Sequence, residues 1–310
     1  MMSAAGSTKM HDVVIVGGNF AGLSAALQLG RVRRRVLVVD AGEPRNRFAV
    51  ASHGFLGQDG EAPFAIQSLA ARQATAYPGV SHAKDRVTAI ETKADGFEVR
   101  LASGDTARAR KLLLATGVRD ELPDVAGLAE RWGKTVAHCP YCHGYELRDR
   151  RLGVLATMPH AAHVALLLPD LGPTTFFTQG LHEPDAEQAA RFRARGIAVE
   201  RSPVVELLGR SPALEAVRLA DGRTVATEAL FVASRVAPAT GLFDAVGCAF
   251  DEGLAGPIVR VDATQQTSVP GVYAAGEVAS PMQSATFASA SGVLAGVSIH
   301  RALVEEDATA

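Results

Sequence analysis

The hydrophobic positions near the start of the chain fall into three segments. The run Asp12–Val16 is apolar after its first residue, which is typical of a buried strand. A Gly-rich turn separates it from the segment Ala21–Leu29, whose Ala and Leu residues favour a helix. A second apolar run, Val36–Asp40, follows. The order strand, helix, strand predicts a β-α-β unit over residues 12–40.

Shorter apolar stretches follow this unit. The region 83–101 and the run Lys111–Ala115 favour short strands, with turn signals at 94–96 and 103–105 between them. A polar, Pro-containing stretch at 118–127 comes next and predicts a linker.

The pattern of strand, helix and strand then returns. Strands are expected at Leu152–Ala156 and Thr174–Phe177, with a helix at Ala161–Leu168 between them. This second unit ends near Leu230–Ala233. It is followed by a second linker at 235–239.

After the second linker, a strand at Gly271–Ala275 and a helix of small residues at Ser284–Ile299 are expected. Two linkers around one segment imply that the first domain is discontinuous. The fold class is therefore predicted to be α/β, with two Rossmann-like nucleotide-binding domains, the second inserted into the first. The expected limits are 1–119 with 238–310 for the first domain and 120–237 for the insert.

Charge and composition exclude several classes of function. The chain of 310 residues carries 31 Lys and Arg against 33 Asp and Glu, a formal charge of −2, so it lacks the basic footprint of a nucleic-acid-binding protein. No stretch of about 18 apolar residues predicts a membrane span. The segment Met1–Met10 has no apolar signal region, so a cytoplasmic protein is expected.

The Gly-rich turn Gly17–Gly22 lies between a predicted strand and a predicted helix. Backbone N–H groups and the helix dipole at such a turn bind a pyrophosphate. Asp40, at the end of the second strand, is placed to accept hydrogen bonds from ribose hydroxyls. Asn19 stands where this motif has its middle Gly, and Asn tolerates left-handed backbone angles. Dinucleotide binding is predicted, and an ordinary strand-to-helix turn is the alternative.

Two of the three cysteines, Cys139 and Cys142, have Cys-x-x-Cys spacing and precede His143. In such a pair one thiolate attacks a disulfide while the other resolves the mixed disulfide. The third cysteine, Cys248, is interpreted as a buried structural thiol.

Three other interpretations of this motif remain. Cys-x-x-Cys-His is also a haem-attachment pattern, which requires a secretory route. A zinc site from His138, Cys139, Cys142 and His143 has suitable ligand types, but adjacent ligands chelate one tetrahedral ion poorly, so no metal is expected. Two buried inert thiols are the third alternative.

The segments Ala115-Thr116-Gly117 and Gly271–Glu277 give the chain a resemblance to the FAD-dependent pyridine-nucleotide disulfide oxidoreductases. In that family the second segment ends in Asp, where this chain has Glu277. The resemblance implies FAD in the discontinuous domain and a homodimer. Arg45 is a candidate partner for a phosphate, and a solvated loop is the alternative. The implied FAD-binding residues are Gly17, Gly18, Asn19, Phe20, Ala21, Gly22, Asp40, Ala41, Arg45, Val87, Ala115, Thr116, Gly117, Gly276, Glu277, Ser284 and Ala285.

The position of the Cys pair in the insert resembles that in low-molecular-weight thioredoxin reductases. This resemblance implies that Cys139 faces the substrate and Cys142 the flavin. Those reductases have an acidic residue where this chain has His143, and the segment Cys139–Glu146 resembles the dithiol oxidases that close disulfides in gliotoxin and holomycin. His143 is the candidate base, because an imidazole beside a thiol takes its proton near neutral pH. A surface histidine is the alternative.

The insert lacks the usual features for NADPH. The turn 156–161 has no Gly to let the backbone approach a pyrophosphate, and Thr178-Gln179-Gly180 stands where the family has a basic cluster for the 2′-phosphate. Use of NADPH through Arg191, Arg193 or Arg195 is possible, although this run is typical of a solvated helix face.

These features together predict a flavoenzyme that interconverts dithiols and disulfides through Cys139 and Cys142. The favoured direction is oxidation of a small-molecule or peptide dithiol, with the flavin reoxidised by O2. The alternatives are an NADPH-dependent reductase of a thioredoxin-like protein or small disulfide, and a redox-sensing flavoprotein without turnover. No nucleic-acid or membrane partner is expected.

Overall fold

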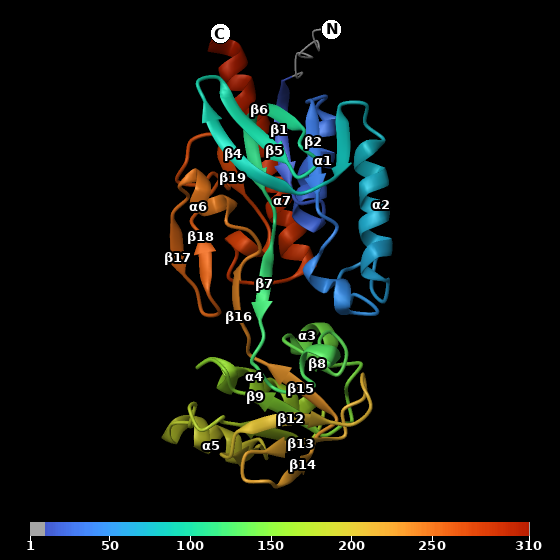
Figure 1. The fold of residues 1–310 in the computed structure, drawn as a ribbon, viewed down its shortest axis with the longest axis vertical. Coiled ribbons are helices and arrows are strands. Elements are labelled where there is room, and N and C mark those ends of the chain that lie inside the picture. The colour runs from blue at the N-terminus through green and yellow to red at the C-terminus, as the bar shows by residue number, and fades with distance from the viewer. Residues whose placement is uncertain (1–9, 310) are drawn as a thin grey trace.

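The computed structural model describes residues 10–309, which form two lobes joined by a narrow ribbon of two strands (Figure 1). Residues 1–9 lie outside the described part. The cytoplasmic location inferred from the N-terminal segment therefore stays a prediction.

The first lobe is built on one large sheet. Its strands are β1 (His11–Val16), β2 (Val36–Asp40), β3 (Val80–Lys84), β4 (Val87–Lys93), β5 (Gly96–Leu101), β6 (Thr106–Leu114) and β19 (Val272–Ala274), with a separate hairpin of β17 (Phe250–Glu252) and β18 (Pro257–Val259). Its helices are α1 (Phe20–Arg31), η1 (Arg45–Phe48), α2 (Pro63–Thr75), α6 (Leu242–Val246), η4 (Glu277–Ala279) and α7 (Ala285–Thr309).

The sheet has the order β3-β2-β1-β6-β5-β4, and β19 also pairs with β6. This is possible because β6 is long: its first half pairs with β5 in an antiparallel manner and its second half pairs in parallel with β19. The predicted β-α-β unit is confirmed as β1, α1 and β2, with β1 and β2 parallel. The late strand β19 thus returns the chain to the same sheet, as the discontinuous arrangement requires.

Two helices pack closely on one face of this sheet. A Cβ at Gly292 of α7 would overlap the backbone of Ala21 in α1, and a Cβ at Gly296 would lie 3.0 Å from the Ala25 oxygen. The two glycines therefore allow α7 to lie directly against α1.

Helix α7 is longer than predicted, because it continues beyond Ile299 to Thr309. Its last turns carry Glu306 and Asp307, which pair with Lys111 and Arg110 of β6 and with Arg34. The apolar pattern stops at Ile299, but these ion pairs connect the polar end of the helix to the sheet.

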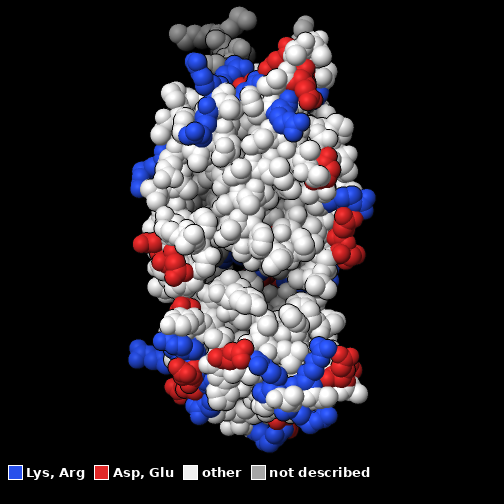
Figure 2. All heavy atoms as spheres, turned by 180° about the vertical axis from the view of Figure 1, so that it is seen from behind, with Lys and Arg blue, Asp and Glu red and all other residues white. Residues whose placement is uncertain are grey.

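By length and composition α7 could cross a membrane, and it is the one such helix in the described part of the chain, with a mean hydropathy of 1.3. A buried core helix passes the same test. A third of its apolar window is buried, and its packing on α1 accounts for the small residues Gly292 and Gly296. The helix lies behind the sheet in Figure 1, and Figure 2 shows that few charged side chains cover the middle of the first lobe on this side.

The second lobe contains a smaller, fully parallel sheet in the order β11-β10-β9-β15-β8, and a three-stranded antiparallel sheet. Its strands are β8 (Val136–Ala137), β9 (Leu152–Leu155), β10 (Thr174–Phe177), β11 (Ala198–Glu200), β12 (Val204–Leu208), β13 (Ala216–Leu219), β14 (Thr224–Ala226) and β15 (Ala229–Val232). Its helices are η2 (Ala129–Arg131), α3 (Pro140–His143), α4 (Ala161–Leu167), η3 (Leu168–Asp170) and α5 (Ala186–Ala194).

The second predicted β-α-β unit is confirmed as β9, α4 and β10.

The two predicted linkers are not irregular throughout. Their first residues form β7 (Val118–Glu121) and β16 (Arg235–Pro238), which pair with each other in an antiparallel ribbon. The predicted domain limits at 119/120 and 237/238 fall within this ribbon. That the two lobes are separate domains with these limits stays a prediction.

The contact between α1 and α7 generates a stability prediction. We expect Gly292→Ala to lower the free energy of unfolding by about 1–3 kcal/mol, because the new methyl group overlaps the α1 backbone. Urea-induced unfolding of the purified protein measures the change. Gly241→Ala is the matched control, since no atom lies within 4 Å of its added Cβ. Equal unfolding midpoints for both variants and the parent would show that α7 does not need this close approach.

Candidate active site

The turn after β1 brings the chain back sharply into α1. Gly17 has φ of +108°, and a Cβ there would overlap the backbone of Ala115 at the end of β6. A Cβ at Gly22 would overlap the Gly17 carbonyl in the same way. Asn19 has φ of −122°, so the turn does not draw on the tolerance of Asn for left-handed backbone angles. The left-handed residue of this turn is Gly17.

The N-terminus of α1 is open to a ligand. Asn19 is the N-cap residue of this helix, and the Asn19 side chain makes no capping hydrogen bond. Asn19 therefore provides no side-chain acceptor for the first backbone N–H groups of the helix. The first turn contains no acidic residue. An anionic group placed there gains from the helix dipole.

Asp40 is held in a fixed orientation beside this turn. Its Oδ1 accepts a hydrogen bond from the Gly18 N–H at 3.2 Å, and its Oδ2 accepts one from Gln67 Nε2 at 2.9 Å. Gln67 also donates to the Gly18 carbonyl at 2.8 Å. Sequence analysis missed Gln67, because nothing in the pattern of α2 distinguishes it from other polar helix residues.

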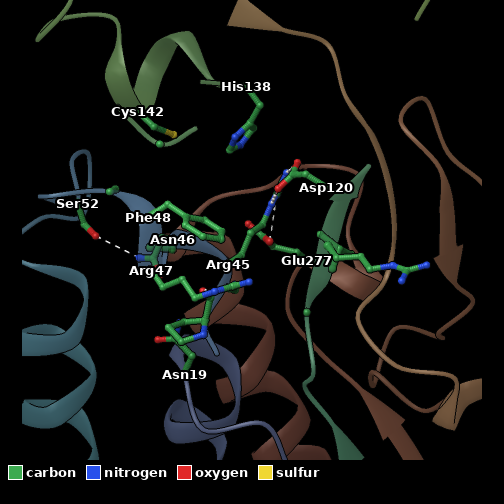
Figure 3. Close-up of a pocket in the computed structure, with 18 of the residues that line it drawn as sticks. Asn19, Arg45, Asn46, Arg47, Phe48, Ser52, Asp120, His138, Cys142 and Glu277 are labelled. Atoms are coloured by element: carbon green, nitrogen blue, oxygen red, sulfur yellow. Dashed lines mark hydrogen bonds and ion pairs between the residues drawn. The ribbon is translucent and has the colours of Figure 1, made fainter. Parts of the chain in front are cut away.

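A cavity of about 600 Å³ lies between the two lobes and η1. The close-up in Figure 3 shows Arg45 and Glu277 on its first-lobe side, with Cys142 and His138 across from them. The predicted site residues that line it are Asn19, Phe20, Ala21, Arg45, Ala115, Thr116, Gly117, Cys142, His143, Gly276, Glu277, Ser284 and Ala285.

Seven predicted site residues do not line this cavity. Gly17, Gly18, Gly22 and Asp40 lie at the turn behind it, and Val87 is buried in the core of the sheet, which leaves only its backbone for a cofactor. Ala41 and Cys139 also lie outside the lining.

The donors and acceptors of this cavity fit a dinucleotide flavin. The Thr116 Oγ1 and Asn46 Oδ1 atoms are buried without a hydrogen-bond partner, and such atoms call for a polar ligand. The N-termini of α1 and α7 lie at the same cavity: that of α1 has no side-chain cap, while in α7 the Ser284 hydroxyl oxygen accepts a hydrogen bond from the Phe287 N–H at 3.1 Å. The residues present therefore fit FAD.

Arg45 is the centre of a buried cluster. Its guanidinium binds Asp120 of β7 through two hydrogen bonds of 2.8 and 2.5 Å, and Glu277 through one of 3.1 Å. Gln283 accepts a fourth bond at 2.6 Å. The side chain is 13% exposed, so the interpretation of this segment as a solvated loop is wrong. The charged partners of Arg45 are therefore carboxylates rather than a phosphate. One of them is Glu277, so this ion pair occupies the side chain that was expected to contact the flavin.

Cys139 and Cys142 form a disulfide, with their Cα atoms 5.3 Å apart. Cys139 is the N-cap residue of α3, and its carbonyl accepts hydrogen bonds from the N–H groups of Cys142 and His143. The bonded sulfurs contradict the interpretation as two inert thiols. Neither is a free thiolate for zinc or haem in this state, and residues 10–309 contain no cluster of three or more His, Cys, Asp or Glu placed to hold a metal ion.

The remaining cysteine, Cys248, is buried, and its Sγ lies 3.6 Å from Thr267 Oγ1. Burial raises the pKa of its thiol, which agrees with its interpretation as a structural residue.

His143 does not lie on the surface. Both of its ring nitrogens are buried without a hydrogen-bond partner, so the alternative of a surface histidine is wrong. Burial lowers the pKa of His143, and the carboxylate of Glu146 partly opposes this effect. The imidazole is therefore neutral near pH 7 and able to accept a proton.

A second histidine, His138, lines the same cavity; from the sequence it is a candidate metal ligand and a polar neighbour that stabilises a cysteine thiolate. Its ring stacks on Trp132, with centroids 6.1 Å apart. Burial and the neighbouring Arg45 hold the pKa of His138 far below its ordinary value, while Asp120 opposes them.

The second β-α-β unit offers little to a nucleotide. At the end of β9, Thr157 Oγ1 donates to the Ala233 carbonyl at 2.6 Å, so the turn closes on its own lobe. At the end of β10, the Thr178 N–H donates to the Glu200 carbonyl. Glu200 forms an ion pair with Arg223 at 2.8 Å, so the positive charge of this nearby arginine is already neutralised.

Comparison with known proteins shows which family the chain belongs to. Residues 11–167 and 173–292 match the pyridine nucleotide-disulphide oxidoreductase family. Thioredoxin reductase tcpT of Claviceps purpurea is 35% identical over 301 residues, which cover 94% of this chain and 93% of that protein.

Solved structures agree with this match. The oxidoreductase from Agrobacterium tumefaciens is 48% identical, with a TM-score of 0.91 over 96% of this chain and 99% of that one. The protein HlmI is 39% identical, with a TM-score of 0.89 over 96% and 94% of the two chains. The predicted α/β fold with two Rossmann-like units and the resemblance to thioredoxin reductases are confirmed.

Similarity to this family and to thioredoxin reductases implies FAD and, typically, NADPH as cofactors. The chain belongs to the pyridine nucleotide-disulphide oxidoreductase family and is an oxidoreductase that acts on sulfur groups.

Proposed function

We propose that the protein is an FAD-dependent oxidase of small-molecule or peptide dithiols. The observation that carries this proposal is that Cys142 lines the cavity that fits FAD, whereas the turn after β9 has no Gly for a second nucleotide. Electrons from a substrate dithiol would enter at the Cys139–Cys142 disulfide. The flavin would be reoxidised by O2.

The residues of the chain divide the work of the first step. A substrate thiolate attacks Cys139 Sγ, which lies outside the cavity lining, and the disulfide bond breaks to leave Cys142 as a thiolate. The second substrate thiol then displaces Cys139 and closes the substrate disulfide. His143, neutral and without a hydrogen-bond partner, accepts a substrate proton. FAD, when bound, supplies the two-electron acceptor for the cysteine pair.

FAD is proposed to lie along the residues that fit it. Its pyrophosphate would lie at the N-terminus of α1 and its ribose at Asp40. Asp40 is suited to this role because Gly18 and Gln67 fix both carboxylate oxygens while leaving lone pairs free. A phosphate contact from Arg45 is not part of the proposal, since four hydrogen bonds already occupy that guanidinium.

The second candidate is an NADPH-dependent reductase of a thioredoxin-like protein or a small disulfide. The family match favours it, because relatives such as tcpT are named thioredoxin reductases. The arginines 191, 193 and 195 do not form a built phosphate site: Arg191 binds Glu187 and Arg195 binds Asp170. A redox-sensing flavoprotein without turnover remains the third candidate.

The choice between these candidates rests on which reductant bleaches the flavin. We expect anaerobic dithiothreitol to bleach the flavin of the holoenzyme, and equimolar NADPH to do so far more slowly, because the β9 turn lacks a pyrophosphate site. Stopped-flow absorbance measures both rates. Rapid bleaching by NADPH would support the reductase.

Cys139→Ser and Cys142→Ser should each abolish bleaching by dithiothreitol, while Cys248→Ser is the matched control and should leave it unchanged. A parent protein that dithiothreitol does not bleach would instead support the sensor.

The role of His143 predicts a characteristic pH dependence. We expect His143→Gln to slow flavin reduction by dithiothreitol about 100-fold at pH 7, since a positioned base contributes roughly 10²–10⁴. Burial lowers the pKa of His143 below the ordinary value of an imidazole, so the neutral base is lost at a lower pH than for a solvated histidine.

The ratio of parent to variant rate constants should therefore decline as the pH falls, with a midpoint below the ordinary pKa of an imidazole. Taking the ratio cancels the titration of the substrate thiols. A ratio near 1 at pH 7 would remove His143 from the mechanism.

We also propose that the protein is a homodimer through α7. The outward side of α7 exposes Phe287, Leu294, Val297 and Val304, each at least 42% exposed. A second copy of the chain is the favoured occupant, because one apolar helix face is complementary to itself in a two-fold dimer.

Substitution of this face tests the dimer. Val297→Glu should convert a dimer into a monomer in analytical ultracentrifugation, because it buries a charge at the proposed interface. Leu254→Glu, on the exposed tip between β17 and β18, is the control and should leave the dimer intact. A parent protein that sediments as a monomer would refute the proposal.

A further inference from the structure

Two histidines flank the disulfide, and both line the cavity. His138 precedes Cys139 and His143 follows Cys142. Only His143 has a role in the mechanism described so far. The charged neighbours of the two rings differ, and this difference separates their functions.

The neighbours of His143 are partly exposed. Its electrostatic partners are Glu146, whose side chain is 41% exposed, and His53, which lies 3.5 Å from the same Glu146 carboxylate. His143 therefore has a partly exposed charged neighbour.

The neighbours of His138 are buried. They are Arg45 and Asp120, whose side chains are 13% and 6% exposed, and His143. Figure 3 shows the His138 ring between Cys142 and Asp120, above Arg45. The stacking on Trp132 holds the plane of the ring. His138 therefore lies on the flavin side of the disulfide.

The buried cluster has one negative charge in excess. Arg45 contributes one positive charge, while Asp120 and Glu277 contribute two negative charges. The pKa of His138 is lowered by burial and by Arg45 and is raised by Asp120, so the ring is neutral while the disulfide is closed. A thiolate formed at Cys142 adds a further negative charge, which favours a cation on the neighbouring ring.

We infer that His138, supported by Asp120, is the proton acceptor for Cys142, while His143 serves the substrate at Cys139. Reduction of the protein disulfide by a dithiol closes the substrate disulfide and leaves two cysteine sulfurs and two protons. His143 takes one proton and His138 the other. When the cysteine disulfide re-forms, bound FAD would accept its two electrons together with one of the two protons, and the other proton would pass from the histidines to solvent.

Asp120 is a positioning residue in this scheme. It keeps a negative charge beside His138 and is itself held by Arg45 and by the Ser234 hydroxyl, which donates to it at 3.0 Å. Without this carboxylate the ring would face Arg45 alone and would become a weaker base.

The inference depends on the proposed function only in placing FAD in the cavity. Its test uses dithionite as the reductant and therefore needs neither a dithiol substrate nor NADPH. The holoenzyme is reduced anaerobically with two electron equivalents. The long-wavelength charge-transfer absorbance of a Cys142 thiolate beside oxidised flavin is then measured against pH.

In the parent protein this absorbance should persist to low pH, because the imidazolium of His138 stabilises the thiolate. In His138→Gln its midpoint should rise by at least about one pH unit, the effect of losing one neighbouring charge. Asp120→Asn should shift the midpoint in the same direction and provides a second test if His138→Gln binds little FAD. His160→Gln, a partly buried histidine outside the cavity, is the matched control and should not shift it.

An unchanged midpoint in both His138→Gln and Asp120→Asn would overturn the inference, as would a parent protein with no such absorbance at any pH. A shift in His143→Gln alone would assign both protons to His143 and also overturn it. Failure of the dithiol oxidase proposal would appear separately, as a normal titration here with no bleaching by dithiothreitol.

Discussion

The arrangement of the site depends on the buried ion pairs of Arg45. This residue lies in η1, yet it binds Asp120 in β7 of the ribbon and Glu277 in η4, which are distant in the sequence. Removal of one partner from such a buried pair costs about 3–5 kcal/mol, because the other charge is left uncompensated. The cluster therefore fixes η1, β7 and η4 around one cavity. It also sets the charge near His138 and Cys142, which line this cavity.

Local patterns were sufficient to predict the two β-α-β units, because an apolar run and the helix that follows it have distinct periods. They also identified the residues at the turn Gly17–Gly22, because the backbone packs so closely there that only Gly, which has no Cβ, fits at Gly17 and Gly22. They did not reveal that the two linkers pair as β7 and β16, since a four-residue strand with polar residues resembles a loop. The length of α7 was underestimated for a similar reason, because ion pairs rather than apolar contacts secure its last turns.

The missed site residues share one property. Gln67 supports Asp40 from α2, and Asp120 reaches Arg45 from the ribbon, so each acts through a partner far along the chain. No periodicity encodes such a pair. His138 stands beside the cysteines in the sequence, but its surroundings are set by Arg45 and Asp120, which only the folded chain brings to it. Sequence analysis therefore located the two sulfurs of the disulfide and left the charged groups around His138 unidentified.

The contacts that hold the disulfide over the cavity are unequal in strength. The Arg45–Asp120 pair is buried, and Asp120 is the third of the four residues of β7, so this pair fixes the ribbon to η1 of the first lobe. The second lobe is held by partly exposed contacts, such as His53 with Glu146 and the hydrogen bond of His160 to the Leu254 backbone. Exposed pairs of this kind contribute about 0–1 kcal/mol. The buried ion pair with Arg45 thus fixes the ribbon, whereas partly exposed contacts hold α3 over the cavity. These contacts are weak enough for a substrate to displace.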